Sequence, residues 1–302
     1  MTEKAKVKIS YFLGKKLGEE LEFILKSDAN VQWCNRGDPE LSQLILVDIE
    51  AMTTDELEDI LTKHGPHVLL VSGHDDEYNF LNYISRYDIN HLIGATLTTV
   101  ENEIKTNIDL ISRNKGCTID SIVNPSGKFY KAIINDSSKV NDSLDELINS
   151  IDIGSFFNSP SEYLKILGNE LVMNALYGAA CDGNGNPLYN ELDRKVQIKL
   201  DRNIDVCIGI DEHVLALSVK DAFGTLTREV LTKSLARSFR EKTFEEKPGG
   251  AGLGFFLIFS HANQLIVNID SNRSTEVICI IDRNKRFKSY KKRITSFHFF
   301  AR

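Results

Sequence analysis

Short apolar runs alternate with amphipathic stretches along the first third of the chain. Strands are expected at Val7–Leu13, Leu44–Ile49, Val68–Val71 and His91–Ile93. Helical periodicity falls between them, at Lys16–Leu25, Thr54–Lys63 and Tyr78–Arg86. Strands that alternate with helices are typical of a doubly wound parallel sheet, in which ligands bind at the carboxyl ends of the strands. We therefore expect residues 1–115 to form an α/β domain.

The pattern changes after residues 112–129, a junction rich in asparagine, glycine and serine. A strand at Phe129–Ile134 and an amphipathic helix at Asp142–Ile151 come first, and a second helix begins near Pro160. The remaining strands follow one another closely, at Val196–Leu200, Val206–Ile210, Leu215–Val219, Leu265–Ile269 and Val277–Ile281. This succession favours an antiparallel sheet, so residues 116–302 are predicted to form an α+β domain.

Length and composition fit a protein of two ordinary domains. The chain has 302 residues, of which 42% are hydrophobic, enough for two cores. No apolar run approaches the roughly 20 residues that span a bilayer, and the N-terminus lacks the apolar segment of a signal peptide. Five scattered cysteines without a Cys-x-x-Cys pair are typical of reduced thiols. We therefore expect a cytoplasmic protein without membrane insertion.

The net charge of −7 argues against a general affinity for nucleic acid. A basic cluster near the C-terminus departs from this balance and comprises Arg283, Lys285, Arg286, Lys288, Lys291, Lys292 and Arg293. It fits either a solvated face or a docking surface for an acidic partner or lipid headgroups. The aromatic segment Ser296–Phe300 that follows is expected to pack against a core or a partner.

A cluster of glycines precedes the apolar run Phe255–Phe259. It consists of Gly249, Gly250, Gly252 and Gly254, with Leu253 among them. Glycines at a helix start let main-chain N–H groups approach a ligand, and the positive end of the helix dipole favours phosphate. The segment therefore predicts a phosphate-binding loop, with a purely structural turn at a helix start as the alternative.

Two polar residues lie four positions apart in the predicted helix that begins near Pro160. Glu170 and Asn174 occur among apolar residues of helical spacing, so they share one face about one turn apart. A carboxylate and an amide oxygen in this arrangement suit a hydrated Mg²⁺ ion. For an isolated pair, an ordinary polar helix face is the alternative.

An aspartate ends an apolar strand and is followed closely by a glycine. The run of residues 214–219 leads to Asp221, and Gly224 permits a sharp turn after it. Beneath a pocket, such an aspartate accepts a hydrogen bond from an exocyclic amine such as that of adenine. An ordinary aspartate between a strand and a turn is the alternative.

Together, these three segments resemble in order and spacing the ATP-binding domain shared by gyrase, histidine kinases and MutL (the GHKL fold). Glu170 and Asn174 match its N box, Asp221 its adenine-binding aspartate and the glycine run its second glycine box. The resemblance covers about residues 128–282 and implies an α/β sandwich that binds ATP or ADP with magnesium. It implies that Asn174 is the metal ligand, and that Gly224 and residues 249–254 contact the cofactor.

The resemblance also implies a mobile lid over the triphosphate. The lid would comprise a basic helical stretch at residues 227–240 and a polar loop at residues 241–247. Its candidates for phosphate contact, each of which is otherwise a solvent-facing charge, are Arg237, Arg240, Lys242 and Lys247. Phe223 departs from the family, which usually has glycine two positions after the aspartate, and we expect it to pack in the core rather than beneath the base.

The first domain resembles the receiver domains of response regulators. Asp48 occupies the place of the phosphoacceptor and Ser72 that of the conserved hydroxyl residue. The chain has Ser10 to Phe12 where receivers carry an acidic pair for Mg²⁺, and Leu92 to Ala95 where a lysine should follow. Phosphoryl transfer to a carboxylate needs these charges. We therefore expect a pseudo-receiver that serves as an interaction or dimerisation surface, in a homodimer.

Within the superfamily, the compact domain and short lid look most like the anti-sigma-factor serine/threonine kinases of bacterial partner-switching systems. No histidine occurs between His91 and His213, which argues against an autophosphorylating histidine kinase. The resemblance implies a signalling kinase that phosphorylates a partner protein with ATP and Mg²⁺, with Glu170 as catalytic base or water-orienting group. The alternative is a nucleotide-dependent switch without turnover, which scaffolds a signalling assembly.

Overall fold

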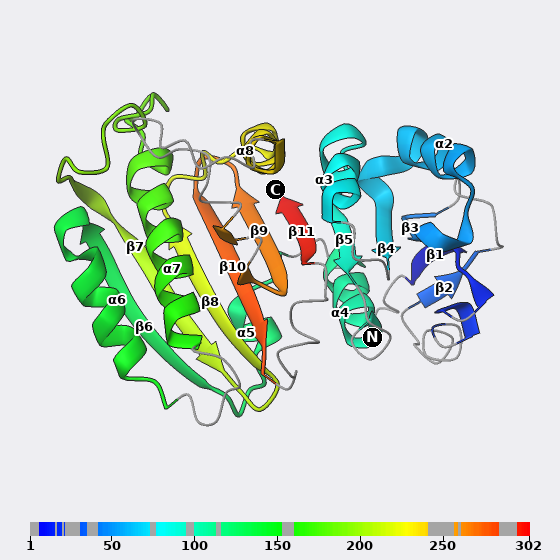
Figure 1. Cartoon of the computed structure of the whole chain (residues 1–302), viewed down its shortest axis with the longest axis horizontal. Helices are drawn as coiled ribbons and strands as arrows, with labels where there is room; N and C mark the ends of the chain where they lie inside the picture. The colour runs from blue at the N-terminus through cyan, green and yellow to red at the C-terminus, as the bar shows by residue number, and fades with distance from the viewer. Residues whose placement is uncertain are drawn as a thin grey trace. The chain divides into compact units, whose positions relative to one another are not determined.

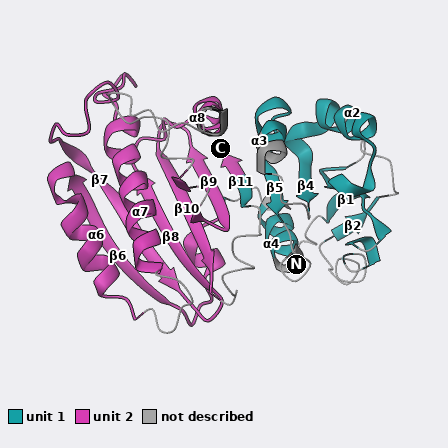
Figure 2. Ribbon diagram, in the orientation of Figure 1, with its two compact units in different colours: residues 1–116, 293–298 teal, residues 117–292, 299–302 magenta. Residues whose placement is uncertain are grey.

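The computed structural model of the chain describes all residues except 1–5, 16, 20, 22–30, 35–41, 73–76, 95–99, 113–115, 153–159, 241–256, 259–260 and 284–294. The chain divides into two compact units (Figure 2). Unit 1 comprises residues 1–116 and 293–298, and unit 2 comprises residues 117–292 and 299–302. The division after residue 116 lies one residue from the boundary expected from the sequence. The C-terminal tail is shared between the two units, whereas the sequence assigned all of it to the second domain.

Unit 1 contains a parallel sheet. Its strands are β1 (Val7–Phe12), β2 (Val31–Trp33), β3 (Leu44–Asp48), β4 (Val68–Ser72) and β5 (His91–Gly94). They are parallel and follow the order β2-β1-β3-β4-β5 (Figure 1). Every residue of β3 and β4 is buried, as expected for strands covered on both faces. The mixed α/β class is confirmed, but β2 was not predicted because three residues carry too short a pattern.

The helices of unit 1 follow the amphipathic stretches of the sequence. They include α2 (Thr54–His64), α3 (Glu77–Arg86) and α4 (Val100–Ser112). A capping box starts α2, because Thr53 Oγ1 accepts from Glu56 N (3.4 Å) and Thr53 N donates to Glu56 Oε2 (3.0 Å). Of the helix expected at residues 16–25, residues 17–19 and 21 are helical, and the others lie outside the described residues.

Unit 2 contains an antiparallel sheet, as the succession of strands predicts. Its strands are β6 (Lys128–Asp136), β7 (Lys199–Ile210), β8 (Val214–Asp221), β9 (Gln264–Asp270) and β10 (Ser274–Asp282). They are antiparallel in the order β9-β10-β8-β7-β6. The two short strands expected at residues 196–200 and 206–210 are one strand, β7. Residues 201–203 of β7 are polar and exposed, so the middle of this strand carries no apolar signal.

Two helices, α6 (Val140–Asn149) and α7 (Pro160–Met173), lie over one face of this sheet (Figure 1). They approach closely because Gly168 of α7 has no side chain: a Cβ there would lie 3.1 Å from Leu144 of α6. The last turn of α7 leads into a π-helical segment, Asn174–Ala179, of a kind often found at functional sites. Unit 2 also contains α5 (Ile119–Ile122) and α8 (Arg228–Arg240).

The C-terminal strand β11 (Ser296–Ala301) contributes residues to both units. In unit 1, Phe297 pairs with Leu92 of β5 in antiparallel register, and its side chain is fully buried. In unit 2, Arg302 N donates to Ile269 O (2.9 Å). The aromatic segment therefore packs in a core as expected, although its strand conformation was not predicted. None of the helices in the described part of the chain combines the length and the apolar character needed to cross a membrane.

Candidate functional site

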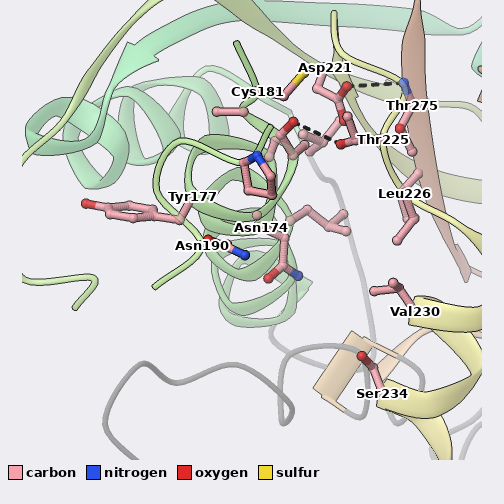
Figure 3. Close-up of a pocket in the computed structure, with 18 of the residues that line it drawn as sticks. Asn174, Tyr177, Cys181, Asn190, Asp221, Thr225, Leu226, Val230, Ser234 and Thr275 are labelled. Carbon is pink, nitrogen blue, oxygen red and sulfur yellow. Dashed lines mark hydrogen bonds between the residues drawn. The ribbon is translucent and has the colours of Figure 1, made fainter. Parts of the chain in front are cut away.

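Unit 2 contains a cavity of about 520 Å³ beside the end of β8 (Figure 3). Its walls come from the end of α7 and the π-helical segment, the loop that follows, the start of α8, and strands β8 and β10. The polar side chains on these walls include Asn174, Arg194, Asp221, Thr225, Ser234 and Thr275. A few polar groups set among apolar walls, in a cavity of this size, are typical of small-molecule sites.

Asp221, the last residue of β8, lines the cavity with only 5% of its surface exposed. Its Oδ1 accepts main-chain hydrogen bonds from Phe223 N (2.8 Å), Gly224 N (3.1 Å) and Thr275 N (3.3 Å). Gly224 has a φ of +66°, and a Cβ there would lie 2.3 Å from Asp270 O, so only glycine fits this turn. Burial raises the pKa of the Asp221 carboxyl above its ordinary value, and the hydrogen bonds oppose that rise only in part.

Thr275 of β10 is a candidate that the sequence did not identify. It pairs with Asp221 in antiparallel register, lines the cavity and is 3% exposed (Figure 3). Its hydroxyl lies near the carboxyl, but Oγ1 makes no hydrogen bond within the described structure, so its single hydrogen can be donated to a ligand. The strand was expected to begin only at Val277, so a threonine before it gave no signal. A buried hydroxyl beside a buried carboxylate is a donor and acceptor pair open to a ligand.

Glu170 and Asn174 share one helix face, as their spacing predicts, and both bind the same guanidinium. Arg194 Nη1 donates to Glu170 Oε2 (3.2 Å), and Nη2 donates to Asn174 Oδ1 (2.8 Å). The ion pair is partly shielded, since 21% of the Arg194 side chain and 20% of the Glu170 side chain are exposed. Asn174 Nδ2 is buried without a partner in the described structure. Arg194 was not predicted because it lies in a polar segment without periodicity.

The main chain around Arg194 is tied to the π-helical segment. The Tyr177 hydroxyl donates to Arg194 O (3.3 Å) and to Val196 O (2.6 Å). Earlier in the same loop, Asp182 Oδ1 accepts from Asn184 N (2.8 Å) and stabilises a turn. These hydrogen bonds hold the loop between α7 and β7 in the position from which the guanidinium reaches Glu170 and Asn174.

The residues as they lie do not fit a magnesium ion. Asn174 Oδ1 and Glu170 Oε2 both accept from Arg194, whose positive charge would lie against a cation bound at either oxygen. Among the residues that the structure describes, no group of three or more His, Cys, Asp and Glu side chains comes together as a metal site. The metal role expected for Asn174 therefore requires Arg194 to move away.

The glycine run lies outside the part of the chain that the structure describes, which does not include residues 241–256. The expected contacts in this segment are Gly249, Gly250, Gly252, Leu253, Gly254, Lys242 and Lys247. The chain is helical at Leu257 and Ile258, as expected for the apolar run after the glycines. The helix expected at residues 227–240 is present as α8, although the side chains of Arg237 and Arg240 in its last turns lie outside what the structure describes.

Phe223 packs in the core, as its apolar character predicts. It is 4% exposed, and the Arg202 guanidinium lies 5.2 Å from the centre of its ring. Phe223 N donates to Asp221 Oδ1, so a phenylalanine at this position leaves the turn intact. The glycine that the turn requires is Gly224, one position later.

In unit 1, Asp48 and Ser72 end the neighbouring strands β3 and β4, and both are buried. Asp48 Oδ2 accepts from Gly14 N and Oδ1 accepts from Glu50 N, both at 3.1 Å. Ser10, in the segment where receivers carry acidic residues, forms a hydroxyl–hydroxyl hydrogen bond with Ser42 instead. Both oxygens of Asp48 therefore stabilise main-chain turns.

No protein-family model matches this sequence, and no curated protein is significantly similar to it. The chemistry of the cavity is therefore the basis for a function. Asp221 and Thr275 offer one acceptor and one donor to a polar ligand, and Arg194 offers a cation on the wall of the same cavity.

Proposed function

We propose that unit 2 is a GHKL-type domain that binds an adenine nucleotide, ATP or ADP. The observation that carries this proposal is the pairing of Asp221 with Thr275 on the wall of the cavity. Adenine presents an amine beside a ring nitrogen, so a carboxylate that accepts and a hydroxyl that donates complement its edge. The cavity of about 520 Å³ has the size of small-molecule sites. Asn174 and Asp221, which the resemblance implies as binding residues, both line this cavity.

The phosphates are proposed to lie toward Asn174, Arg194 and the glycine run at residues 249–254. Arg194 supplies a guanidinium on the cavity wall, and guanidinium groups bind phosphate oxygens in pairs. Main-chain N–H groups at a helix start would complete the phosphate site. Gly224 contributes by forming the turn that holds Asp221: its main-chain N–H donates to the carboxyl, and its positive φ permits the turn.

We infer that the chain acts as a nucleotide-dependent switch in a bacterial signalling pathway and works through a partner protein. Two observations support a switch over an enzyme. Arg194 binds both Glu170 Oε2 and Asn174 Oδ1, so a guanidinium occupies the place in which a kinase of this type would hold its metal ion. Both Asp48 oxygens accept main-chain hydrogen bonds, which favours unit 1 as a pseudo-receiver that binds a partner or a second copy in a homodimer.

Phosphorylation of a serine or threonine on the partner is the second candidate function. It is favoured by the position of Glu170 and Asn174, whose side-chain oxygens face the same guanidinium, that of Arg194. In this function ATP and Mg²⁺ would be the cofactors, and Arg194 would swing away to admit them. Transfer of label from ATP to a protein in cell lysate, lost in Glu170→Gln, would favour this candidate.

Calorimetric titration of the full chain with ADP tests the proposed site. Asp221→Asn removes the acceptor for the adenine amine and is expected to weaken binding by at least about tenfold. Glu276→Gln is the matched control. Glu276 lies beside Thr275, its pKa is also raised by burial, and it accepts from Ser218 Oγ (2.7 Å), but it does not line the cavity. Equal losses in both variants, or no ADP binding to the folded chain, would refute the proposal.

A further inference from the structure

The Arg194 guanidinium occupies the place that Glu170 and Asn174 would offer to a metal ion. It donates to one oxygen of each residue, at 3.2 and 2.8 Å. A guanidinium and a divalent cation cannot share the Asn174 oxygen, because two positive charges would then lie in contact. The pair already has a cation, and the chain itself supplies it.

Arg194 can bind a second ligand without leaving this place. Its side chain lines the cavity and is 21% exposed. The guanidinium carries more N–H donors than the two that Glu170 and Asn174 use. Its planar fork matches the spacing of phosphate oxygens, whereas Mg²⁺ requires octahedral geometry and gives up its water reluctantly. A phosphate bound beside Asn174 would therefore meet a guanidinium that is already oriented.

The main chain keeps Arg194 in place. Tyr177 donates to Arg194 O and Val196 O from the same helical segment that begins with Asn174. The guanidinium and the residues it binds are thus joined by hydrogen bonds of both the side chain and the main chain. A group held in this way loses less conformational entropy when a ligand binds.

We propose that Arg194 takes the place of the divalent cation, so that the site binds the phosphates of an adenine nucleotide without magnesium. The inference rests on the proposed nucleotide-binding function and concerns the phosphate end of the same site. Glu170 then acts as the counter-ion that orients Arg194, and Asn174 as its second anchor.

The test is a calorimetric titration of the full chain with ADP, once with Mg²⁺ and once with EDTA. The wild-type chain is expected to bind equally in both buffers, within about twofold. Arg194→Met is expected to weaken binding in EDTA by at least about tenfold, and Mg²⁺ should restore part of the loss because both oxygens are released. Lys195→Met is the matched control: it removes an exposed positive charge one residue away, and its affinities should stay at the wild-type values.

Two outcomes would overturn the inference while leaving the nucleotide site in place. One is wild-type binding that weakens by about tenfold or more in EDTA. The other is an Arg194→Met chain that binds ADP with Mg²⁺ more tightly than wild type, which would identify Arg194 as a block. If Arg194→Met does not fold, Arg194→Lys replaces it. This variant is expected to bind ADP more weakly than the wild-type chain, and to the same extent in both buffers. A folded wild-type chain that binds no ADP in either buffer refutes the proposed nucleotide site itself.

Discussion

Asp48 of unit 1 and Asp221 of unit 2 begin from the same sequence signal and reach different structures. Each ends a strand that is mostly apolar and mostly buried, and the exposed fractions of the two aspartates are 6% and 5%. Asp48 uses one oxygen for Gly14 N and the other for Glu50 N. Asp221 receives its three main-chain hydrogen bonds on a single oxygen, Oδ1.

An aspartate at a strand end is therefore a structural cap or a ligand site according to how the following turn is built. When both carboxylate oxygens accept hydrogen bonds from main-chain N–H groups, the aspartate stabilises the fold. When one oxygen takes every main-chain donor and the carboxyl also lines a cavity, it is available to recognise a ligand. The glycine whose N–H reaches each carboxylate, Gly14 or Gly224, therefore matters as much as the aspartate itself.

The largest expected effect comes from Gly224→Ala, which breaks the turn of Asp221. The added Cβ would lie 2.3 Å from Asp270 O and 2.7 and 2.8 Å from two main-chain nitrogens, at a φ of +66°. We expect the free energy of unfolding to fall by at least about 3 kcal/mol. Gly185→Ala is the control, since Gly185 has a φ of +84° but no atom near the added Cβ, and should cost only about 1–2 kcal/mol. Urea denaturation that gives equal losses would contradict the overlap at Gly224.

Asparagine substitutions at the two aspartates should change the free energy of unfolding differently, and by less than Gly224→Ala does. Asp48→Asn places an amide donor against the N–H of Gly14 or Glu50, and is expected to lower the free energy of unfolding by about 1–3 kcal/mol. Asp221→Asn keeps an oxygen for all three main-chain donors and removes a buried charge, so stability should hold or rise. Urea denaturation of both variants measures the contrast. A loss in Asp221→Asn as large as that in Asp48→Asn would remove the distinction between the two sites.

The pH dependence of Asp221 gives a third comparison. Because its pKa is raised in the folded chain, the folded state binds the proton more tightly than the unfolded state does. Wild-type stability relative to Asp221→Asn should therefore fall as pH rises from the ordinary value of 3.8 through the raised pKa. ADP affinity should change in the opposite direction, weakening as the pH falls through the raised pKa, because protonation removes the acceptor. Denaturation and ADP titrations from about pH 4 to about pH 7 would reveal both trends, and a flat stability difference would contradict them.

The smallest expected effect lies beneath the Asp221 turn. Arg202 lies over the Phe223 ring and donates to Ala222 O (2.7 Å). Arg202→Met keeps the apolar stem but removes the charge, so the free energy of unfolding should fall by only about 0.5–1 kcal/mol. Thermal denaturation against Lys195→Met as a charge-matched control measures this change. A loss of several kcal/mol would mean that the turn depends on Arg202 more than on the Gly224 geometry.

Features carried by local patterns were predictable from the sequence. The strand ending at Asp221 follows from its apolar run, the shared face of Glu170 and Asn174 follows from helical spacing, and the burial of Phe223 follows from its apolar side chain. Each of these depends on neighbours within a few residues. Helical and strand periods therefore contain the necessary information.

Features that depend on distant contacts were not predictable in the same way. Arg194 reaches Glu170 from 24 residues away through a loop whose shape is set by turns and by Tyr177. Thr275 meets Asp221 only because β10 pairs with β8 in one register. Strand β2 is too short to show a period. In each case tertiary contacts, rather than local preference, decide the position of the residue.

The most direct test of adenine recognition by Asp221 and Thr275 is to compare the affinities of ADP and inosine diphosphate for the wild-type chain. Inosine has a carbonyl in place of the adenine amine and a protonated ring nitrogen beside it, so it reverses both hydrogen bonds that the pair would make. ADP is expected to bind at least about tenfold more tightly than inosine diphosphate, and Asp221→Asn should abolish that preference. Equal affinities of the two nucleotides for the wild-type chain would contradict adenine recognition at this site.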